Sequence, residues 1–268
     1  MDMINRQATV PGAKLHYEIR GVGPLLLVIG SPMAAAEFAQ LADALSSDYT
    51  VVTYDPRGHG SSATSDPDDD ATADQRADDV VAILDDLGAA DADVFGSSGG
   101  AVTGLALVSR HPGRVRTLVA HEPPLLELLP DAEEQRRATE AIVETFRTEG
   151  FGAAWHHFMV NAGFDLPSPG PDAPSPPAPT DHQHAEAARF FEHELRPTTR
   201  YLPDIPALSA CNVVVGIGED SGHLVTYRTS VALADLLGVK PVDFPGDHGG
   251  FLGAPVEFAD RLREVLAR

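Results

Sequence analysis

The sequence predicts an α/β fold with a doubly wound, mostly parallel sheet, and three observations lead to this fold class. Apolar strand segments alternate with helical segments along most of the chain. Some strand segments are continuously apolar, as in LLLVIG at 25–30, which is typical of strands buried on both faces of a parallel sheet. The length of 268 residues suits one large domain, or a core domain with an inserted lid.

The predicted elements follow one another in a regular order. Short alternating segments around a Pro-Gly turn within 8–20 predict a β-hairpin. Further strands are expected at 25–30, 50–54, 92–96, 115–120, 211–218 and 240–246. Helices are expected at 34–46, 72–87, 99–110, 226–237 and 255–267. Right-handed crossovers between the parallel strands complete the expected topology.

This alternation of strands and helices breaks between 123 and 206. Helices are predicted there at 131–149, 150–162 and 181–195. The segment 165–181 is too rich in proline for a helix or a central strand, so we expect an exposed loop. We therefore assign 1–122 and 207–268 to an α/β core, and 123–206 to a helical lid with a Pro-rich loop over the carboxyl-terminal edge of the sheet.

Composition and charge argue against several classes of partner. The net charge of −21 disfavours nucleic acids and anionic membranes, because both need positive charge at the contact. A single cysteine, Cys211, permits no intramolecular disulfide, and no signal-like or membrane-spanning segment is apparent, so we expect a cytoplasmic protein. No histidines and carboxylates show convincing metal-ligand spacing, and we expect neither metal nor cofactor. The sequence leaves a homodimer open.

The segment Gly96-Ser97-Ser98-Gly99-Gly100 carries the strongest functional signal. It lies between a buried strand and a helix, where the G-x-S-x-G spacing holds the central serine in a sharp turn above the sheet. The small residues around it prevent a clash between strand and helix. The Gly99 amide, at the start of the helix, can donate to a developing oxyanion. The motif therefore predicts that Ser98 is a nucleophile.

A serine nucleophile needs a general base and an acid that orients the base. Of eleven histidines, His248 in DFPGDHGGF follows the last strand, from which a glycine-rich loop can reach the serine. The acid is ambiguous, because Asp220 or Glu219 occupies the commoner position after the preceding strand. Glu122 directly follows the apolar strand after the elbow, where a charge without a partner is costly. We favour Glu122 and keep both alternatives open.

Four segments resemble the α/β-hydrolase superfamily over nearly the whole chain: LLLVIGSP, YDPRGHGSS, VFGSSGG and FPGDHGGF. Within that superfamily, the elbow and the segment AHEPP at 120–124 resemble the fungal-type zearalenone lactonases, whose triad glutamate lies in a Cys-His-Glu-Leu-Pro segment. This resemblance implies that Glu122 completes the triad. The match is weaker in the lid, which determines the choice of substrate.

The resemblance also implies a second oxyanion donor in the loop after LLLVIG. That loop reads Gly30-Ser31-Pro32-Met33, and Pro32 has no N–H to donate. We favour the Ser31 amide as the donor, with the Met33 side chain lining the substrate pocket. Apolar side chains of the lid either extend this pocket or pack the lid onto the core: Trp155, Phe158, Met159, Phe190 and Phe191.

Together these residues predict a serine hydrolase that cleaves a small-molecule carboxylic ester or lactone through an acyl-enzyme on Ser98; a zearalenone-type lactonase is one such enzyme. Two alternatives remain. One is C–C bond hydrolysis or cofactor-free perhydrolysis on the same triad, which a fold alone does not distinguish. The other is a hydrolase-like receptor that binds a ligand with little turnover. The presence of Ser98, His248 and a carboxylate argues against a receptor.

Overall fold

A single mixed sheet organises the computed structural model, which describes residues 3–165 and 180–267. The strand order is β1-β2-β4-β3-β6-β7-β8-β9, and β5 pairs with β2. β1, β2 and β4 pair antiparallel, as does β5 with β2, and all the pairs from β4 to β9 are parallel. The strands are β1 Ile4–Val10, β2 Ala13–Arg20, β3 Leu25–Ile29, β4 Thr50–Tyr54, β5 Ala63–Thr64, β6 Ala92–Ser97, β7 Val115–His121, β8 Asn212–Gly218 and β9 Val242–Phe244. The predicted mostly parallel sheet and its opening hairpin are confirmed.

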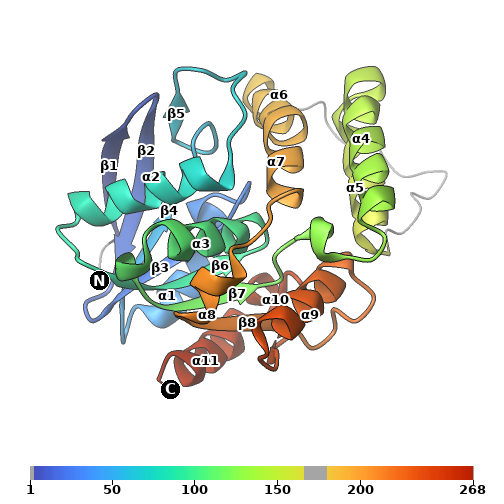
Figure 1. Ribbon diagram of the computed structural model, residues 1–268. Coiled ribbons are helices and arrows are strands. Elements are labelled where there is room, and N and C mark those ends of the chain that lie inside the picture. Colours follow the sequence, from blue (N-terminus) through green and yellow to red (C-terminus); the bar gives the residue numbers. More distant parts are fainter. Residues whose placement is uncertain (1–2, 166–179, 268) are drawn as a thin grey trace.

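Two apolar layers explain why the LLLVI strand is hydrophobic throughout. Because side chains alternate along a strand, Leu27 and Ile29 of β3 join one core cluster, whereas Leu26 and Val28 join the other. The first cluster includes residues of α2, α3, α8 and α9, and the second includes residues of α1, α10 and α11 (Figure 1). These helices are α1 Ala39–Leu45, α2 Ala73–Asp86, α3 Gly99–Arg110, α8 Ile205–Ser209, α9 Val225–Leu237, α10 Gly250–Gly253 and α11 Pro255–Leu266. The short helices α8 and α10 are absent from the sequence prediction.

Helical insertions lie between β7 and β8, as predicted, and Figure 1 shows them standing together beside the sheet. They share a small apolar core of their own, to which Ile142, Phe146 and Phe191 belong. The helices are α4 Ala132–Glu149, α5 Phe151–Ala162, α6 Asp181–Ala188, a π-helix Arg189–Glu194 and α7 Leu195–Thr199. Short 3₁₀ segments occur here and in the core at Ala35–Phe38, Pro112–Arg114 and Leu126–Leu128. The predicted Pro-rich loop at 165–181 lies almost wholly outside the described residues.

The helices of the two described ranges differ in length and apolar character. The 18-residue α4 carries exposed charged side chains such as Glu133, Arg137 and Glu144 in addition to its buried positions. No helix within 3–165 or 180–267 is both long enough and apolar enough to cross a membrane.

Candidate active site

Four of the predicted site residues follow the carboxyl ends of neighbouring parallel strands. Ser31 follows β3, Ser98 follows β6, Glu122 follows β7 and His248 follows β9. These strands are adjacent in the order β3-β6-β7-β8-β9, so their carboxyl ends share one edge of the sheet. Open α/β sheets bind ligands at this edge.

Ser98 occupies the sharp turn that the motif predicts. Its backbone has φ 56° and ψ −124°, and its N–H donates to the carbonyl oxygen of His121 at 2.9 Å. α3 starts at the next residue and passes very close to β3. A Cβ atom added at Gly100 would lie 2.2 Å from the carbonyl oxygen of Ile29, so a side chain there would force the helix away from the strand. The glycine therefore allows the close approach that holds Ser98 above the sheet edge.

Two members of the predicted triad share an unusual backbone conformation. Ser98 with φ 56° and Glu122 with φ 50° are the non-glycine residues with positive φ in the described part of the chain. Such a conformation costs about 1–3 kcal/mol, and it persists where the surrounding structure holds it. At Glu122 the N–H donates to the carbonyl oxygen of Gly216 on the neighbouring strand at 3.1 Å. Strained residues of this kind cluster at functional sites.

A short hydrogen bond joins Glu122 to His248. The Nδ1 atom of His248 lies 2.6 Å from Oε2 of Glu122, which is fully buried. The same carboxylate accepts from the Gly218 N–H and from the Thr226 hydroxyl, each at 2.8 Å. Burial opposes ionisation, but the hydrogen bond from His248 and the nearby imidazoles lower the pKa of Glu122 to about 2. The carboxylate is therefore ionised at neutral pH and acts as an acceptor.

The two other candidates for the acid of the triad lie in a different turn of the same sheet edge. Glu219 and Asp220 are exposed in the turn after β8, where their backbone N–H groups donate to the carbonyl oxygens of Phe244 and Gly246. The carboxylate that contacts His248 belongs to Glu122. The structure thus brings Glu122 to the imidazole and leaves the side chains of the other two in solvent.

A cavity of about 400 Å³ opens beside these residues, and Ser98 and His248 both line it. No hydrogen bond among the described residues joins their side chains, so the serine hydroxyl faces the cavity unpaired. Five predicted pocket residues line this cavity: Met33, Trp155, Phe158, Met159 and Phe190. The sequence prediction missed several further lining residues, namely Thr139, Ile142, Asn161, Phe164, Leu195, Thr198, Thr199, Phe251 and Leu252. Only the last two, which closely follow His248 in the chain, could have been inferred from sequence position.

Phe191, which was expected either to extend the pocket or to pack the lid onto the core, does not line the cavity. This side chain is fully buried in the apolar core of the insertion, where its ring stacks on Phe146 with a centroid distance of 5.2 Å. Successive side chains of a helix point in different directions, and here Phe190 reaches the cavity whereas Phe191 does not. Phe190 faces the cavity, and Phe191 packs on the inner side.

The two predicted oxyanion donors lie on loops that touch each other. Gly99 is the first residue of α3, so its N–H is one of the helix's initial donors without an intrahelical partner. A Cβ atom added at Gly99 would lie 2.5 Å from the Ser31 carbonyl oxygen. Both residues line the cavity. Gly99 and Ser31 therefore lie next to each other at the cavity that Ser98 lines.

Beneath the site lies a buried histidine that the sequence analysis did not single out. His121 is fully buried, and neither of its ring nitrogens has a hydrogen-bond partner among the described residues. Its ring packs among Phe95, Phe244 and Phe258, with centroid distances of 5.8, 5.7 and 5.4 Å, and lies 6.3 Å from the His248 ring. Burial lowers the pKa of His121 to about 4. The ring is therefore neutral at physiological pH.

A second histidine–carboxylate pair joins the insertion to the core. The Nε2 atom of His59, in the turn after β4, lies 3.0 and 2.9 Å from the two carboxylate oxygens of Glu194. Arg189 in the same π-helix donates to the carbonyl oxygens of Arg57 and Pro67 at 3.1 and 2.9 Å. These contacts attach the insertion to the loops that follow β4 and β5.

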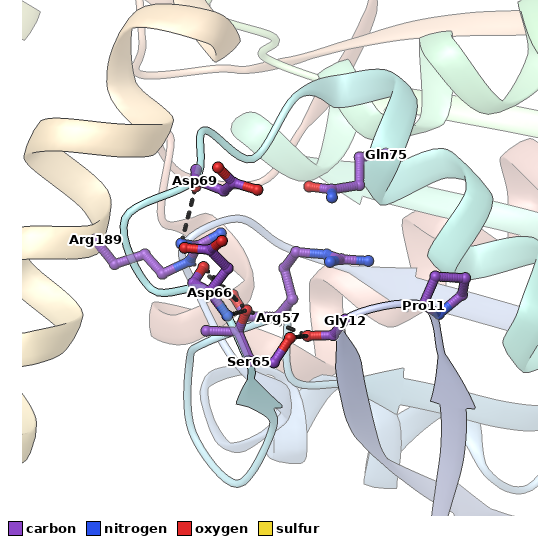
Figure 2. Close-up of a pocket in the computed structure, with 9 residues that line it drawn as sticks. Pro11, Gly12, Arg57, Ser65, Asp66, Asp69, Gln75 and Arg189 are labelled. Carbon is purple, nitrogen blue, oxygen red and sulfur yellow. Dashed lines mark hydrogen bonds between the residues drawn. The ribbon is translucent and has the colours of Figure 1, made fainter.

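Beside this pair, a polar cavity of about 220 Å³ lies between the insertion and the loop after β5 (Figure 2). Arg57 and Arg189 line it, and Gln75 lines it from α2. Neither Ser98 nor His248 lines this cavity. Within 3–165 and 180–267, no group of three or more His, Cys, Asp or Glu side chains is placed to hold a metal ion.

Comparisons with known proteins agree with this architecture. The alpha/beta hydrolase fold profile matches residues 23–203. An uncharacterized hydrolase, YraK of Bacillus subtilis (strain 168), is 33% identical over 277 residues, which cover 100% of this chain and 98% of that protein. A zearalenone hydrolase of Cladophialophora bantiana is 34% identical over 120 residues, which cover 43% of this chain and 45% of that protein.

Among solved structures, a thermophilic esterase from Thermogutta terrifontis superposes with a TM-score of 0.74 at 19% identity, over 100% of this chain and 98% of that one. At this identity the likeness shows the fold. The sequence profile and the full-length relative go further and show the family. This chain belongs to the α/β-hydrolase fold family and is a hydrolase of that superfamily.

Proposed function

We propose that the protein hydrolyses carboxylic esters or lactones, with Ser98 as nucleophile, His248 as general base and Glu122 as the acid that orients the base. One observation carries the proposal: Nδ1 of His248 lies 2.6 Å from Oε2 of Glu122, beside the cavity that Ser98 lines. The three residues play the roles of a serine, histidine and acid triad.

The ionised Glu122 determines which ring nitrogen can act as the base. A carboxylate with a pKa of about 2 only accepts hydrogen bonds, so the Nδ1 atom of His248 carries the proton that it donates. Nε2 is then unprotonated and can take the Ser98 proton while Oγ attacks the substrate carbonyl carbon. The Gly99 and Ser31 N–H groups stabilise the resulting oxyanion. Formation of this oxyanion is the step that needs the most electrostatic stabilisation.

The same imidazole completes the reaction. Protonated His248 donates its Nε2 proton to the leaving alcohol oxygen, and the carbonyl re-forms as an acyl-enzyme on Ser98. Water enters, gives a proton to His248 and attacks the acyl carbon; collapse releases the acid and returns the proton to Ser98. With a lactone, the acid and alcohol leave as one hydroxy acid.

The similarity to known enzymes supports an ester or lactone as the substrate. The zearalenone hydrolase match covers less than half of either chain, so we take it as support for a lactonase chemistry and not for zearalenone itself. The cavity walls are largely apolar, with Phe158, Phe164 and Phe190 among them. Such walls suit the apolar acyl or alcohol part of an ester.

A fluorophosphonate probe tests the proposal directly. We expect the probe to label Ser98 covalently, and the label and ester hydrolysis to disappear together in Ser98→Ala. Ser97→Ala is the matched control, because the neighbouring hydroxyl is fully buried and makes no hydrogen bond to a described residue. A screen of esters, lactones, β-diketones and peracid formation separates hydrolysis of C–O bonds from the two alternative reactions. A folded wild-type protein that takes up no label would contradict the proposal.

A further inference from the structure

The charge of the large cavity is as informative as its shape. Of the described residues that line it, only Asp247 and His248 carry ionisable side chains, and no lysine or arginine lies among them. The segment 166–179, outside the described residues, contains no lysine or arginine either. Sites that bind carboxylate or phosphate groups use such cations, and arginine above all. The described lining of the cavity therefore holds no lysine or arginine that could neutralise an anionic substrate.

Asp247 is held in place beside His248, in the loop after β9. Its Oδ1 atom accepts a hydrogen bond from the Gly249 N–H at 2.8 Å, and its carbonyl oxygen accepts from the Gly250 N–H at 2.9 Å. No ion pair in the described part of the chain uses its carboxylate. The loop thus fixes an acidic residue without a paired cation at the cavity, one residue from the general base.

We propose that Asp247 makes the site selective for uncharged apolar esters or lactones and excludes substrates that carry a carboxylate near the scissile bond. The inference rests on the proposed function. An anionic substrate would bring a second negative charge into an apolar cavity, where like charges repel more strongly than in water. It would also lose its hydration without gaining a cationic partner.

The remaining walls favour an apolar substrate for a separate reason. Leu126, Ile142 and Leu195 face the same space as the phenylalanines. Burying apolar substrate surface against them is favourable, and an anionic group of the same size forfeits that gain. The net charge of −21 adds a long-range repulsion of anions during approach.

A matched pair of esters tests this selectivity. 4-Nitrophenyl hydrogen glutarate carries a free carboxylate, its methyl ester does not, and both release nitrophenolate. We expect the wild type to prefer the methyl ester by about 100-fold or more in kcat/KM, and Asp247→Asn to reduce that preference about tenfold. The asparagine keeps an oxygen to accept from the Gly249 N–H. Asp235→Asn, an exposed change on α9 outside the cavity, is the control for net charge.

Salt provides a second measurement on the unaltered enzyme. Added sodium chloride screens charge repulsion, so it should raise kcat/KM for the carboxylate ester and leave the methyl ester unaffected. Equal rates on the two esters in the wild type, or an Asp247→Asn effect no larger than that of Asp235→Asn, would overturn the inference while the proposed function stands. Failure to cleave either ester, together with no labelling of Ser98, would overturn both.

Discussion

Two buried histidine–glutamate pairs in this protein are alike in their contacts and different in their surroundings. In the first, Nδ1 of His248 lies 2.6 Å from Glu122; in the second, Nε2 of His59 lies 2.9 Å from Glu194. Both carboxylates are almost completely buried. In both, burial opposes ionisation, yet the neighbouring cationic and hydrogen-bonding groups hold the pKa of the glutamate below its ordinary value.

The difference lies in what else each imidazole can reach. The His248 side chain is 18% exposed and lines a cavity that Ser98 also lines. The His59 side chain is 4% exposed, and its partner Glu194 also lies 3.3 Å from the Arg189 guanidinium. A short contact between histidine and carboxylate therefore does not identify a catalytic pair. Access of the second ring nitrogen to a nucleophile does, which is why we assign proton transfer to the first pair and attachment of the insertion to the second.

The charged groups near the two histidine–glutamate pairs also differ. Arg57 donates twice to Asp79 close to the second pair, and the fully buried Arg76 donates to Thr198 of the insertion at 2.8 Å. These bonds tie α2, the loop after β4 and the insertion together. The first pair instead lies beside the neutral ring of His121 and the apolar cavity. A network of fixed ion pairs suits stability, whereas a single pair beside an open space suits chemistry.

The largest effect that would test this contrast is expected from Glu122→Ala. Removing the acid leaves the His248 tautomer and orientation uncontrolled, so kcat/KM for ester hydrolysis should fall by about 10⁴-fold. Steady-state kinetics measures the loss, and circular dichroism checks that the variant is folded. Asp220→Ala, in the exposed turn after β8, should change kcat/KM less than twofold. If Asp220→Ala proved the more damaging of the two, the acid would be misassigned.

Removing the other glutamate should affect stability first. Glu194→Ala leaves His59 and Arg189 buried without their carboxylate, which should lower the free energy of unfolding by about 3 kcal/mol. Urea denaturation measures this value. Glu192→Ala is the control in the same π-helix: it breaks a partly exposed ion pair with Arg147 and should cost no more than about 1 kcal/mol. A Glu194→Ala variant with unchanged stability and little activity would instead place the second pair in the reaction.

The elements that carry the site were predictable because their signals are local. The LLLVI strand is apolar throughout since both faces of the sheet are covered, and the glycines around Ser98 are needed where α3 passes β3. Glu122 could be chosen from a resemblance and from the cost of a charge after an apolar strand. Its positive φ and its hydrogen bond from Thr226, 104 residues away, have no local signal.

The insertion was predictable only as a set of helices. Its register against the core depends on contacts between residues far apart in sequence, such as His59 with Glu194, which are separated by 135 positions. Phe190 and Phe191 lie in a π-helix, where the first lines the cavity and the second is buried in the core of the insertion. Periodicity along one segment cannot supply information of this kind.

The smallest effect concerns His121, a buried histidine that forms no ion pair or hydrogen bond with a carboxylate of the described residues. Its folded pKa of about 4 lies below the ordinary value of 6.5, so the unfolded chain binds the proton first as the pH falls. The free energy of unfolding is therefore not reduced by His121 above pH 6.5. It declines as the pH falls from 6.5 towards 4, and this group causes no further loss below pH 4. Between pH 7 and pH 5 the loss should be about 2 kcal/mol. The Glu122 carboxylate, with its pKa lowered from 4.5 to about 2, contributes its own loss only below this window.

His121→Phe should remove that loss, because a phenylalanine fits among Phe95, Phe244 and Phe258 and buries no unsatisfied nitrogen. In urea denaturation at pH 7 and pH 5, the free energy of unfolding of the variant relative to the wild type should be about 2 kcal/mol higher at pH 5 than at pH 7. His156→Phe, at an exposed position on α5, is the control and should keep the wild-type slope. Parallel stability curves for His121→Phe and the wild type would mean that the buried ring accepts a proton in the folded state. The neutral ring beside the first pair would then no longer distinguish its surroundings from the charged network around the second.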